Sequence, residues 1–294
     1  MTSSTPSSAG AANTAQVRTS PEFVERLLAA AEAMKAELDN LREQADARQY
    51  HLEQVGREIA LAARLQRDFL PRKLPEVGCL RFHVAHRAAS GVSGDMYGID
   101  RLDEAHVGLH LIDAVGHGMP AALLSMFLHH AVRPKIVGDR GYELLAPGEV
   151  MSRLNSSLCG QSLSNGFFAT ALYAKLNAET GVVEVGRGGH PLPLLVREGR
   201  VFPVPCDGAL LGIIPDETFE VGRVDMREGD KLVFCTDGAE ALFASDGGPG
   251  DTDTWTSGIQ ARASLSAKAL AADVLGRIGD PPADDVTVVV VEHL

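Results

Sequence analysis

The stretch from residue 109 to residue 120, LHLIDAVGHGMP, constrains the fold most, because it specifies three consecutive elements. Its hydrophobic run is typical of a buried strand and ends at Asp113. The glycines that follow permit a tight turn, and Pro120 favours the first turn of a helix. The stretch therefore predicts a strand with an acidic tip, a glycine-rich loop and the beginning of a helix.

Three further aspartates lie at predicted strand ends: Asp95, Asp237 and Asp284. Strand ends hold side chains at fixed points, and a hard divalent cation needs oxygen ligands held in that way. Four converging carboxylates would repel one another, and a cation would relieve that repulsion. Taken singly, however, Asp237-Gly238 is a common turn dipeptide and Asp284-Asp285 suits a solvated loop. The residues alone leave a metal site and four ordinary turns both open.

A long helical pattern begins at Pro21, with Ser20 suited to the N-cap, and stops at Pro71. Apolar residues repeat along it with a heptad period. The a positions are Val24, Ala31, Leu38, Ala45, Leu52, Ile59 and Gln66, and the d positions are Leu27, Met34, Leu41, Arg48, Val55, Ala62 and Phe69. So narrow a stripe needs a partner, most simply a second copy of the chain in a coiled-coil homodimer. The alternative is a helix folded back on its own domain.

The pattern divides the chain into three segments. Residues 1–20 are rich in Ser, Thr, Ala and Gly and are predicted to be a disordered tail. Residues 21–71 are predicted to be a coiled-coil linker and dimerisation helix, and residues 72–294 a globular domain.

Within the globular domain, strands are predicted in hairpin series that helix pairs interrupt. The predicted strands are residues 80–88, 96–102, 106–112, 167–176, 182–187, 192–196, 200–204, 219–224, 231–235 and 286–291. The predicted helices are residues 119–133, 147–158 and 264–278, and residues 241–260 are expected to form a surface loop. This order indicates an α+β fold rather than a strict βαβ repeat.

The charge balance excludes some classes of partner. There are 27 Lys and Arg residues against 39 Asp and Glu residues, a net charge of −12, whereas nonspecific binding to nucleic acid or acidic membranes needs a basic face. No run approaches the ~20 apolar residues that span a bilayer, and the N-terminus lacks the pattern of a secretory signal. The four cysteines have no close spacing, which favours a reducing compartment. We therefore expect a cytoplasmic protein that binds neither nucleic acid nor membrane.

Several short blocks occur in a characteristic order. They are residues 65–71 (LQRDFLP), 92–97 (VSGDMY), 113–118 (DAVGHG), 168–170 (FAT), 189–191 (GHP), 208–212 (GALLG), 236–238 (TDG) and 284–287 (DDVT). In this order the chain from about residue 58 to residue 294 resembles the SpoIIE/RsbU-like bacterial group of the PPM-type (type 2C) Ser/Thr protein phosphatases. It departs from the group's pattern at Ser93, Met96 and Gly98, where the group usually has glycine, tyrosine and aspartate.

The resemblance implies a PPM-phosphatase-like β-sandwich flanked by helix pairs (α-β-β-α), with two Mn²⁺ or Mg²⁺ ions at one edge. It implies that Asp113 bridges both ions and that the backbone carbonyl of Ala114 binds one of them. Asp237 and Asp284 would complete the other site, and Asp95 would coordinate directly or through water. With Asp113, Asp237 and Asp284 as catalytic residues, the metals would activate a water that hydrolyses phosphoserine or phosphothreonine, with no phosphoenzyme.

The group's usual substrate further implies a phosphorylated STAS-domain anti-anti-sigma factor in a partner-switching pathway as the partner. Two alternatives stay open: a catalytically silent phosphatase-fold interaction module, and a two-metal hydrolase of another phosphate ester. His117 has no assigned role, because orienting a phosphate and capping the loop are equally compatible with its position. His190, between Gly189 and Pro191, suits a structural role in a turn.

Overall fold

The computed structural model describes residues 21–139, 141–161, 163, 166–244, 252–280 and 282–294. The predicted disordered tail, residues 1–20, lies outside the described residues. The chain divides into two compact units, Met1–Arg57 and Glu58–Leu294, and helix α1 (Pro21–Phe69) contains the boundary between them. None of the described helices combines the length and the apolar character that crossing a membrane requires.

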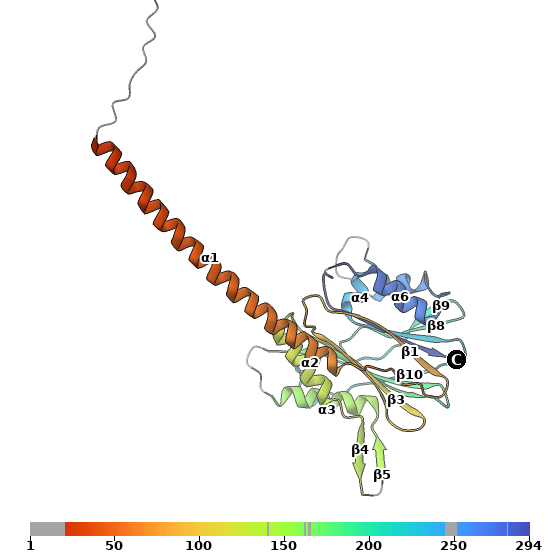
Figure 1. Ribbon diagram of the computed structural model, residues 1–294. Helices are drawn as coiled ribbons and strands as arrows, with labels where there is room; N and C mark the ends of the chain where they lie inside the picture. Colours follow the sequence, from red (N-terminus) through yellow and green to blue (C-terminus); the bar gives the residue numbers. More distant parts are fainter. Residues whose placement is uncertain (1–20, 140, 162, 164–165, 245–251, 281) are drawn as a thin grey trace, which may run out of the picture. The chain divides into compact units, whose positions relative to one another are not determined.

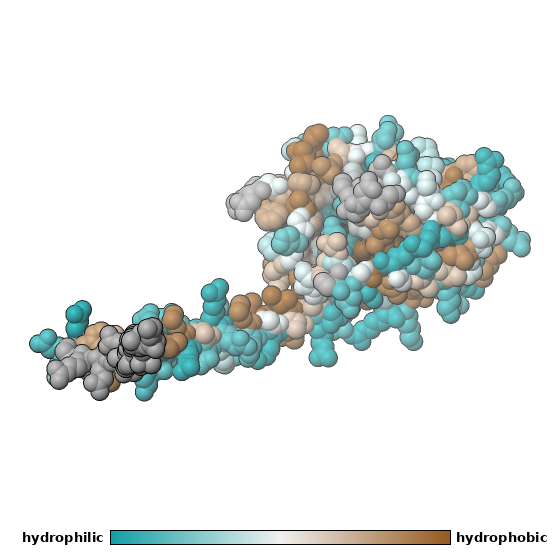
Figure 2. All heavy atoms as spheres, turned by 90° about the horizontal axis from the view of Figure 1, so that it is seen from above, coloured by the Kyte–Doolittle hydropathy of each residue, from teal (hydrophilic) through white to brown (hydrophobic). Residues whose placement is uncertain are grey.

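Helix α1 has 49 residues, and its heptad stripe is exposed along the first unit. The exposed a and d side chains there are Val24, Leu27, Met34, Leu38, Leu41, Leu52 and Val55. Figure 2 shows apolar side chains interspersed with hydrophilic ones along this part of the helix. The helix ends at Phe69, two residues before Pro71, because the residue that precedes a proline disfavours the helical conformation. The predicted helix is thus present, and its apolar stripe is accessible in the single chain.

The second unit contains two five-stranded antiparallel sheets that pack face to face (Figure 1). The first sheet has the order β10 (Val221–Asp225), β7 (Val182–Gly188), β6 (Ala169–Asn177), β3 (His106–Ala114), β2 (Asp95–Arg101). The second has the order β1 (Leu80–Arg87), β12 (Val286–His293), β11 (Lys231–Cys235), β8 (Leu194–Arg197), β9 (Arg200–Pro203). The predicted strands all occur, with ends that differ from the prediction by at most two residues.

Helices cover the outer face of each sheet, which confirms the predicted α+β sandwich (Figure 1). Helices α2 (Met119–Ala131) and α3 (Pro147–Cys159) pack on the first sheet. Helices α4 (Asp237–Ala241), α5 (Thr252–Gln260) and α6 (Ala267–Arg277) lie on the second. The inner strands β3, β11 and β12 are therefore buried on both faces, and their sequences are nearly continuous hydrophobic runs rather than alternating ones.

Alternation along β3 assigns its residues to two separate cores. Val107, Leu109 and Leu111 belong to the core between the sheets, whereas Ile112 and Ala114 belong to the core beneath α2 and α3. Successive side chains of a strand point to opposite faces, so both sets follow from one extended backbone. Asp113 thus continues the series that faces the opposite sheet.

The predicted surface loop at residues 241–260 is wrong for its second half, which forms helix α5. Trp255 and Ile259 are fully buried beneath it, and the Trp255 ring packs against Phe243 with 5.4 Å between ring centroids. These two apolar residues stand four apart and so share one helix face. The signal is weak in sequence because Thr, Ser and Gly, which are poor helix formers, surround them.

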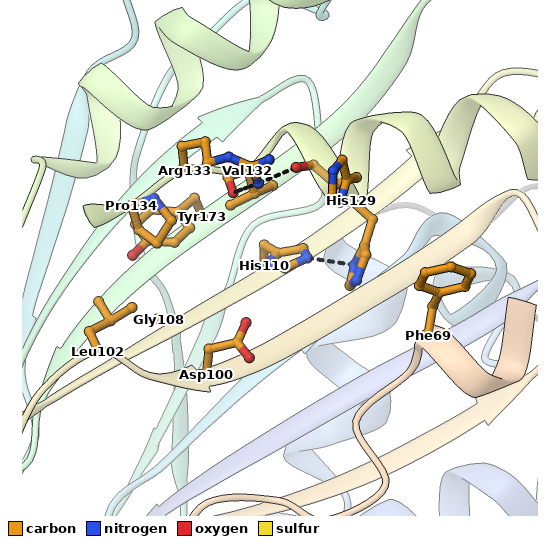
Figure 3. Close-up of a pocket in the computed structure, with 11 residues that line it drawn as sticks. Phe69, Asp100, Leu102, Gly108, His110, His129, Val132, Arg133, Pro134 and Tyr173 are labelled. Atoms are coloured by element: carbon orange, nitrogen blue, oxygen red, sulfur yellow. Dashed lines mark hydrogen bonds between the residues drawn. The ribbon is translucent and has the colours of Figure 1, made fainter. Parts of the chain in front are cut away.

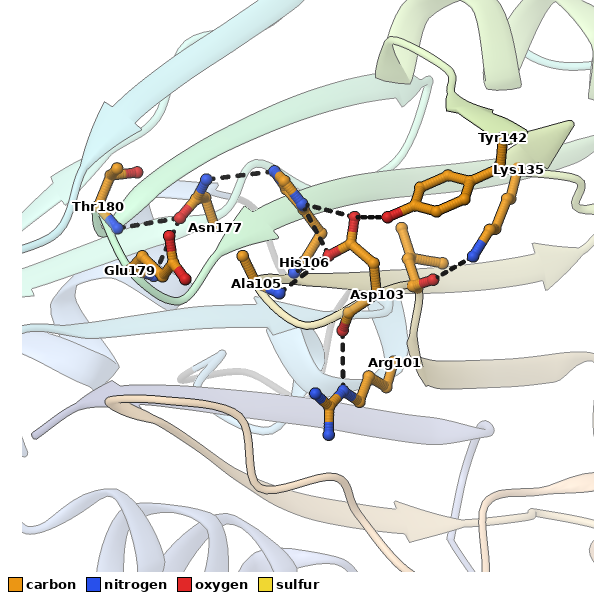
Figure 4. A network of polar contacts seen from close by, with 10 residues as sticks. Arg101, Asp103, Ala105, His106, Lys135, Tyr142, Asn177, Glu179 and Thr180 are labelled. Carbon is orange, nitrogen blue, oxygen red and sulfur yellow. Dashed lines mark hydrogen bonds and ion pairs between the residues drawn. The ribbon is translucent and has the colours of Figure 1, made fainter. Parts of the chain in front are cut away.

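A hairpin of β4 (Lys135–Gly138) and β5 (Gly141–Leu144), which the sequence did not predict, is joined to the sandwich through Asp103 (Figure 4). The Asp103 carboxylate accepts hydrogen bonds from the Ala105 and His106 amides at 2.9 and 2.7 Å and from the Tyr142 hydroxyl at 3.1 Å. It also lies 2.9 Å from His106 Nδ1. Lys135 Nζ donates to the Leu102 carbonyl at 2.6 Å. One carboxylate therefore fixes both the β2–β3 turn and the hairpin.

We expect Asp103→Asn to destabilise the protein by about 1 kcal/mol at pH 7, because an amide N–H₂ group replaces an oxygen that accepts hydrogen bonds. Burial alone would raise the pKa of Asp103, but the hydrogen bonds from Ala105, His106 and Tyr142 outweigh it and lower the pKa to about 2. A lowered carboxyl pKa stabilises the fold above the unfolded-state pKa of about 4, and that contribution is lost as the pH falls towards 2.

Urea unfolding of both proteins between pH 7 and pH 2.5 measures the difference. The difference should shrink below pH 4, and a difference independent of pH would contradict a role for the carboxylate charge. Asp225→Asn, at an exposed aspartate on β10, is the matched control.

Candidate metal centre

The register of β2 and β3 places Asp95 directly opposite Asp113. Tyr97 and Leu111, which flank this pair along the two strands, belong to the core between the sheets. Because side chains two residues apart share a face, both carboxylates face the second sheet. Asp95 is buried at 1% exposure, and Asp113 is partly buried.

The second sheet brings its own aspartates to the same end of the sandwich. Strand β11 ends at Cys235 and β12 begins at Val286, and these two strands are antiparallel neighbours. Asp237 follows the end of β11 and Asp284 precedes the start of β12, so both lie at that end of the sheet. Both are exposed to solvent.

Two threonine hydroxyls join the aspartates of the two sheets. Thr236 Oγ1 and Thr287 Oγ1 donate to Asp95 Oδ2 at 2.7 and 2.6 Å. Thr236 Oγ1 in turn accepts from the Thr287 amide at 3.0 Å. Because Thr236 precedes Asp237 and Thr287 lies three residues after Asp284, these bonds fix how the two acidic strand ends meet.

The carboxylates raise one another's pKa values. Burial raises the pKa of Asp113, and the charges of Asp95, Asp237, Asp284 and Asp285 raise it further. Burial also raises the pKa of Asp95, although the Thr287 and Thr236 hydroxyls lower it in part. The pKa of Asp237 is raised because its carboxylate is partly removed from water and because Asp284 is negatively charged. Three carboxylates with raised pKa values beside further acidic side chains fit a divalent cation, which would favour the charged forms of Asp95, Asp113 and Asp237.

The oxygen-only donor set fits Mg²⁺ or Mn²⁺ rather than a softer metal. As they stand, though, the side chains do not form a coordination shell. Across the part of the chain that the structure describes, no three His, Cys, Asp or Glu side chains gather closely enough to hold a metal ion. The predicted residues therefore share one end of the sandwich, and their carboxylates would have to rotate to converge on an ion.

The loops around the site need glycine at two points. Gly116 and Gly118, between β3 and α2, have φ values of 91° and 74°, which L residues with a side chain rarely adopt. A Cβ on Gly238 would lie 2.1 Å from the Asp285 carbonyl oxygen, so only glycine lets α4 begin this close to the Asp284–Asp285 backbone. The Asp237-Gly238 dipeptide is thus more than a turn signal.

Ala114, the predicted carbonyl ligand, is buried and its amide donates to the Gly94 carbonyl at 3.2 Å. A Cβ on Gly94 would lie 3.0 Å from the Ala114 carbonyl oxygen. This oxygen is therefore held beside the loop that carries Asp95. Asp95, Asp113, Ala114, Asp237 and Asp284 all lie at one end of the sandwich, and their roles as metal ligands and catalytic residues stay predictions.

Asp285 lies in the same region, and the sequence analysis assigned it no role. Its Oδ1 accepts from the Ala89 amide at 2.7 Å, and its Oδ2 accepts from the Gly94 amide at 2.6 Å. The carboxylate therefore attaches the loop before Asp95 to the start of β12. The sequence shows the adjacent pair Asp284-Asp285, but it does not show that Asp285 binds backbone amides while Asp284 is the predicted ligand.

Gln66, near the end of α1 and within the second unit, was also missed. Its Oε1 accepts from the Ser93 amide at 2.8 Å, and its Nε2 donates to the Ser93 carbonyl at 2.7 Å. Ser93 Oγ then accepts from the Asp95 amide at 3.1 Å. The serine that replaces the group's usual glycine thus supports Asp95, and the helix end is attached to the same loop.

The two histidines differ in their surroundings. His117 is exposed and forms no hydrogen bond with the described residues. His190 is buried, and its Nδ1 lies 2.8 Å from Thr170 Oγ1. Burial, and then the charge of Arg187, lower the pKa of His190 to about 3, so the ring is neutral at neutral pH. Thr170 pairs with Asp113 across β3 and β6, so His190 supports the strand beside the site.

Comparison with known sequences identifies a family. The family described as Stage II sporulation protein E (SpoIIE) matches residues 103–294, about two thirds of the chain. Phosphoserine phosphatase RsbP of Bacillus subtilis is 27% identical over 194 residues, 64% of this chain and 46% of RsbP. Phosphoserine phosphatase RsbU of the same organism is 24% identical over 197 residues, 66% of this chain and 57% of RsbU. The chain thus spans about half the length of these curated relatives.

Solved structures share the fold. The SiaA-PP2C domain of Pseudomonas aeruginosa matches with a TM-score of 0.65 at 17% identity, over 82% of this chain and 97% of that domain. The catalytic domain of the serine threonine protein phosphatase PstP, solved in complex with 2 manganese ions, matches with a TM-score of 0.53 at 17% identity, over 72% of this chain and 97% of that domain. The family match over more than half of its length shows that the chain belongs to the SpoIIE family of PPM-type phosphatase domains.

We expect Asp113→Asn to stabilise the metal-free protein by about 1–2 kcal/mol at pH 8, because it removes one charge from the acidic cluster. A raised carboxyl pKa destabilises the fold increasingly as the pH rises from about 4 through the folded-state pKa. The gain should therefore be larger at pH 8 than at pH 5.

Thermal unfolding in EDTA measures this gain, and the same scan with Mn²⁺ tests the ligand role. The wild type should gain stability from Mn²⁺ and the variant should lose most of that gain. Equal Mn²⁺ stabilisation of the two proteins would exclude Asp113 as a ligand. Asp225→Asn is again the control, because this exposed aspartate lies on β10.

Proposed function

Because the chain belongs to the SpoIIE family, we propose that it is a metal-dependent protein Ser/Thr phosphatase that hydrolyses phosphoserine or phosphothreonine. The observation that carries the proposal is the position of four aspartates at the same end of the sandwich: Asp95 and Asp113 come from one sheet, and Asp237 and Asp284 come from the other. The names of RsbP and RsbU, both phosphoserine phosphatases, support the reaction class.

In this proposal Asp113 would hold two Mn²⁺ or Mg²⁺ ions together, with the Ala114 carbonyl on one and Asp237 and Asp284 on the other. Asp95 would bind directly or through water, since its Oδ1 accepts no hydrogen bond from the described residues. When bound, such ions lower the pKa of a water nucleophile and stabilise charge on the phosphoryl oxygens.

The chain's own residues would position these groups. Asp285 and Gln66 hold the loop before Asp95 from two sides, through the Gly94 and Ser93 backbones. The N-terminus of α2 follows the Asp113 loop directly, and its free amides would favour a phosphate oxyanion nearby. The phosphate would thus meet the acidic centre at the point where β3 passes into α2.

The physiological substrate proposed here is a phosphorylated STAS-domain protein, and this step rests on the family alone. We further propose that the chain is a homodimer through α1. The exposed Leu27, Met34 and Leu41 support it, since their burial against a second copy would remove apolar surface from water.

One observation favours a second candidate, a catalytically silent interaction module. The carboxylates do not converge in the described residues, and Asp95 Oδ2 is already engaged by two hydroxyls. In that case the acidic cluster would have only a structural role. A hydrolase of a different phosphate ester differs from our proposal only in its substrate.

We expect the purified chain to release phosphate from a phosphoserine peptide only when Mn²⁺ or Mg²⁺ is present, and Asp113→Ala to lower that rate at least 100-fold. Malachite-green detection of phosphate measures the rate, with Asp225→Asn as the control that keeps full activity. No metal-dependent release from phosphopeptides or from an aryl phosphate, despite folded protein, would favour the silent module. Faster release from small phosphates than from phosphopeptides would favour the other hydrolase.

We expect deletion of residues 1–56 to convert the dimer to a monomer, because it removes most of the apolar stripe and ends at the boundary between the two units. Light scattering coupled to size-exclusion chromatography measures the mass of both proteins at equal concentration. Leu27→Glu/Leu41→Glu, in the full chain, should have the same effect by placing charges in the stripe. A truncated protein that remains dimeric would sink the proposed interface.

A further inference from the structure

The helix-covered face of the first sheet contains a cavity of about 230 Å³ that the proposed function does not use (Figure 3). Its walls come from β2, β3, β6 and the residues at the C-terminal end of α2. Gly108 and His110 of β3 line it, and they alternate with Leu109 and Leu111, which face the other sheet. The cavity therefore lies on the opposite side of this sheet from Asp95 and Asp113.

The floor of the cavity has a hydroxyl without a partner. Tyr173 of β6 is 1% exposed, and its hydroxyl forms no hydrogen bond with the described residues. A Cβ on Gly108 would lie 2.8 Å from this hydroxyl oxygen, so the group stands directly over the β3 backbone. Buried side-chain polar groups are almost always paired, so an unpaired one beside a cavity is available to a bound water or ligand.

Two histidines that are hydrogen-bonded to each other line one side of the cavity. His110 Nε2 and His129 Nδ1 are 2.9 Å apart and share a hydrogen bond. A Cβ on Gly98 would lie 2.2 Å from His110 Cε1, so the imidazole packs flat against a strand that offers no side chain there. Burial lowers the pKa of His110 to about 3 and also lowers the pKa of His129, so both rings are neutral at neutral pH.

The rim of the cavity carries one charge of each sign. Asp100 lies at its rim and forms no hydrogen bond or ion pair with the described residues. The guanidinium of Arg133, also at the rim, donates instead to the backbone carbonyls of His130 and Val132. These carbonyls belong to the end of α2, where the helix dipole adds further negative potential. The Arg133 guanidinium thus already has carbonyl partners, whereas the Asp100 carboxylate is available to a cation.

An apolar hollow of about 350 Å³ adjoins the cavity. It is lined by Met126 and Phe127 of α2 and shares Phe69, His129 and His130 with the first cavity. The Phe69 ring is half exposed, so a bound group could cover it. A ligand that filled both spaces would carry its charge at one end and an apolar body at the other.

We propose that the two hollows together bind a small primary ammonium ion with an apolar or aromatic body. The ammonium group, with its three N–H donors, donates to the Asp100 carboxylate and to the unpaired Tyr173 hydroxyl oxygen. The body packs against Phe69 and Met126, and the aromatic ring of Phe69 also attracts the cation. The two acceptors lie close to each other. Burial is the main cause of the raised pKa of Tyr173, and the charge of Asp100 is the second cause. This site is independent of the proposed phosphatase reaction.

Isothermal titration of the full chain with 2-phenylethylammonium tests the proposal. We expect it to bind at least tenfold more tightly than 2-phenylethanol, which is neutral, and than 3-phenylpropanoate, which is an anion. Butylammonium, which keeps the charge and lacks the ring, should bind several-fold more weakly than 2-phenylethylammonium. No binding of any amine, or binding of the alcohol or the anion as tight as that of the amine, would overturn the proposal. Equal binding of both amines would overturn the role of the apolar hollow.

Two variants locate the site. Asp100→Asn should weaken amine binding at least tenfold, and Tyr173→Phe should weaken it several-fold; neither removes a group that the fold pairs with another. Asp216→Asn, at an exposed turn outside the cavity, should leave binding unchanged. Circular dichroism checks that each variant is folded. Unchanged amine affinity in folded Asp100→Asn would show that the amine binds elsewhere.

Discussion

The two hydrogen bonds that Asp95 accepts from Thr236 and Thr287 are the constraint on which the acidic centre depends. Asp95 belongs to the first sheet, and both threonines belong to the second. A buried carboxylate is costly unless polar groups surround it, so the two sheets are held in the one arrangement that provides both hydroxyls. The β2–β3 register already places Asp113 opposite Asp95, and the bonds to Thr236 and Thr287 bring the neighbouring Asp237 and Asp284 to the same end of the sandwich.

The proximity of these carboxylates also destabilises the folded protein, because like charges repel one another. Burial and the charges of neighbouring carboxylates raise the pKa values of Asp95, Asp113 and Asp237. Both carboxylate oxygens of Asp285 accept hydrogen bonds, from the Ala89 and Gly94 amides. A cation bound by the cluster would therefore stabilise the folded protein in two ways. It would neutralise the repulsion between the carboxylates, and it would draw them together as its ligands. Metal binding and folding stability are coupled in such an arrangement.

Much of this could be predicted from the sequence. The β3 strand, its acidic tip and the loop to α2 follow from one hydrophobic run that ends at glycines, and β11 has the predicted ends. The ordered blocks placed the five site residues in one region. They could not separate Asp284 from Asp285, because the role of each depends on the path of the backbone into β12. Gln66 was equally hidden, since a polar residue in a heptad a position gives no hint of a partner 27 residues away. The sequence analysis did not predict helix α5, because Trp255 and Ile259 are the two buried residues that mark its inner face.

Strands β2 and β3 carry different chemistry on their two faces, and this follows from the two-residue period of a strand. Asp95 and Asp113 point between the sheets, whereas Gly98, Asp100 and His110 point towards α2. Helix α2 also contacts both regions, since it begins at the Asp113 loop and ends beside His129. Protein interiors are close-packed, so a displacement at one end of such a helix is transmitted to the other. Any coupling between the ammonium cavity and the acidic centre therefore has to pass through these two strands and this one helix.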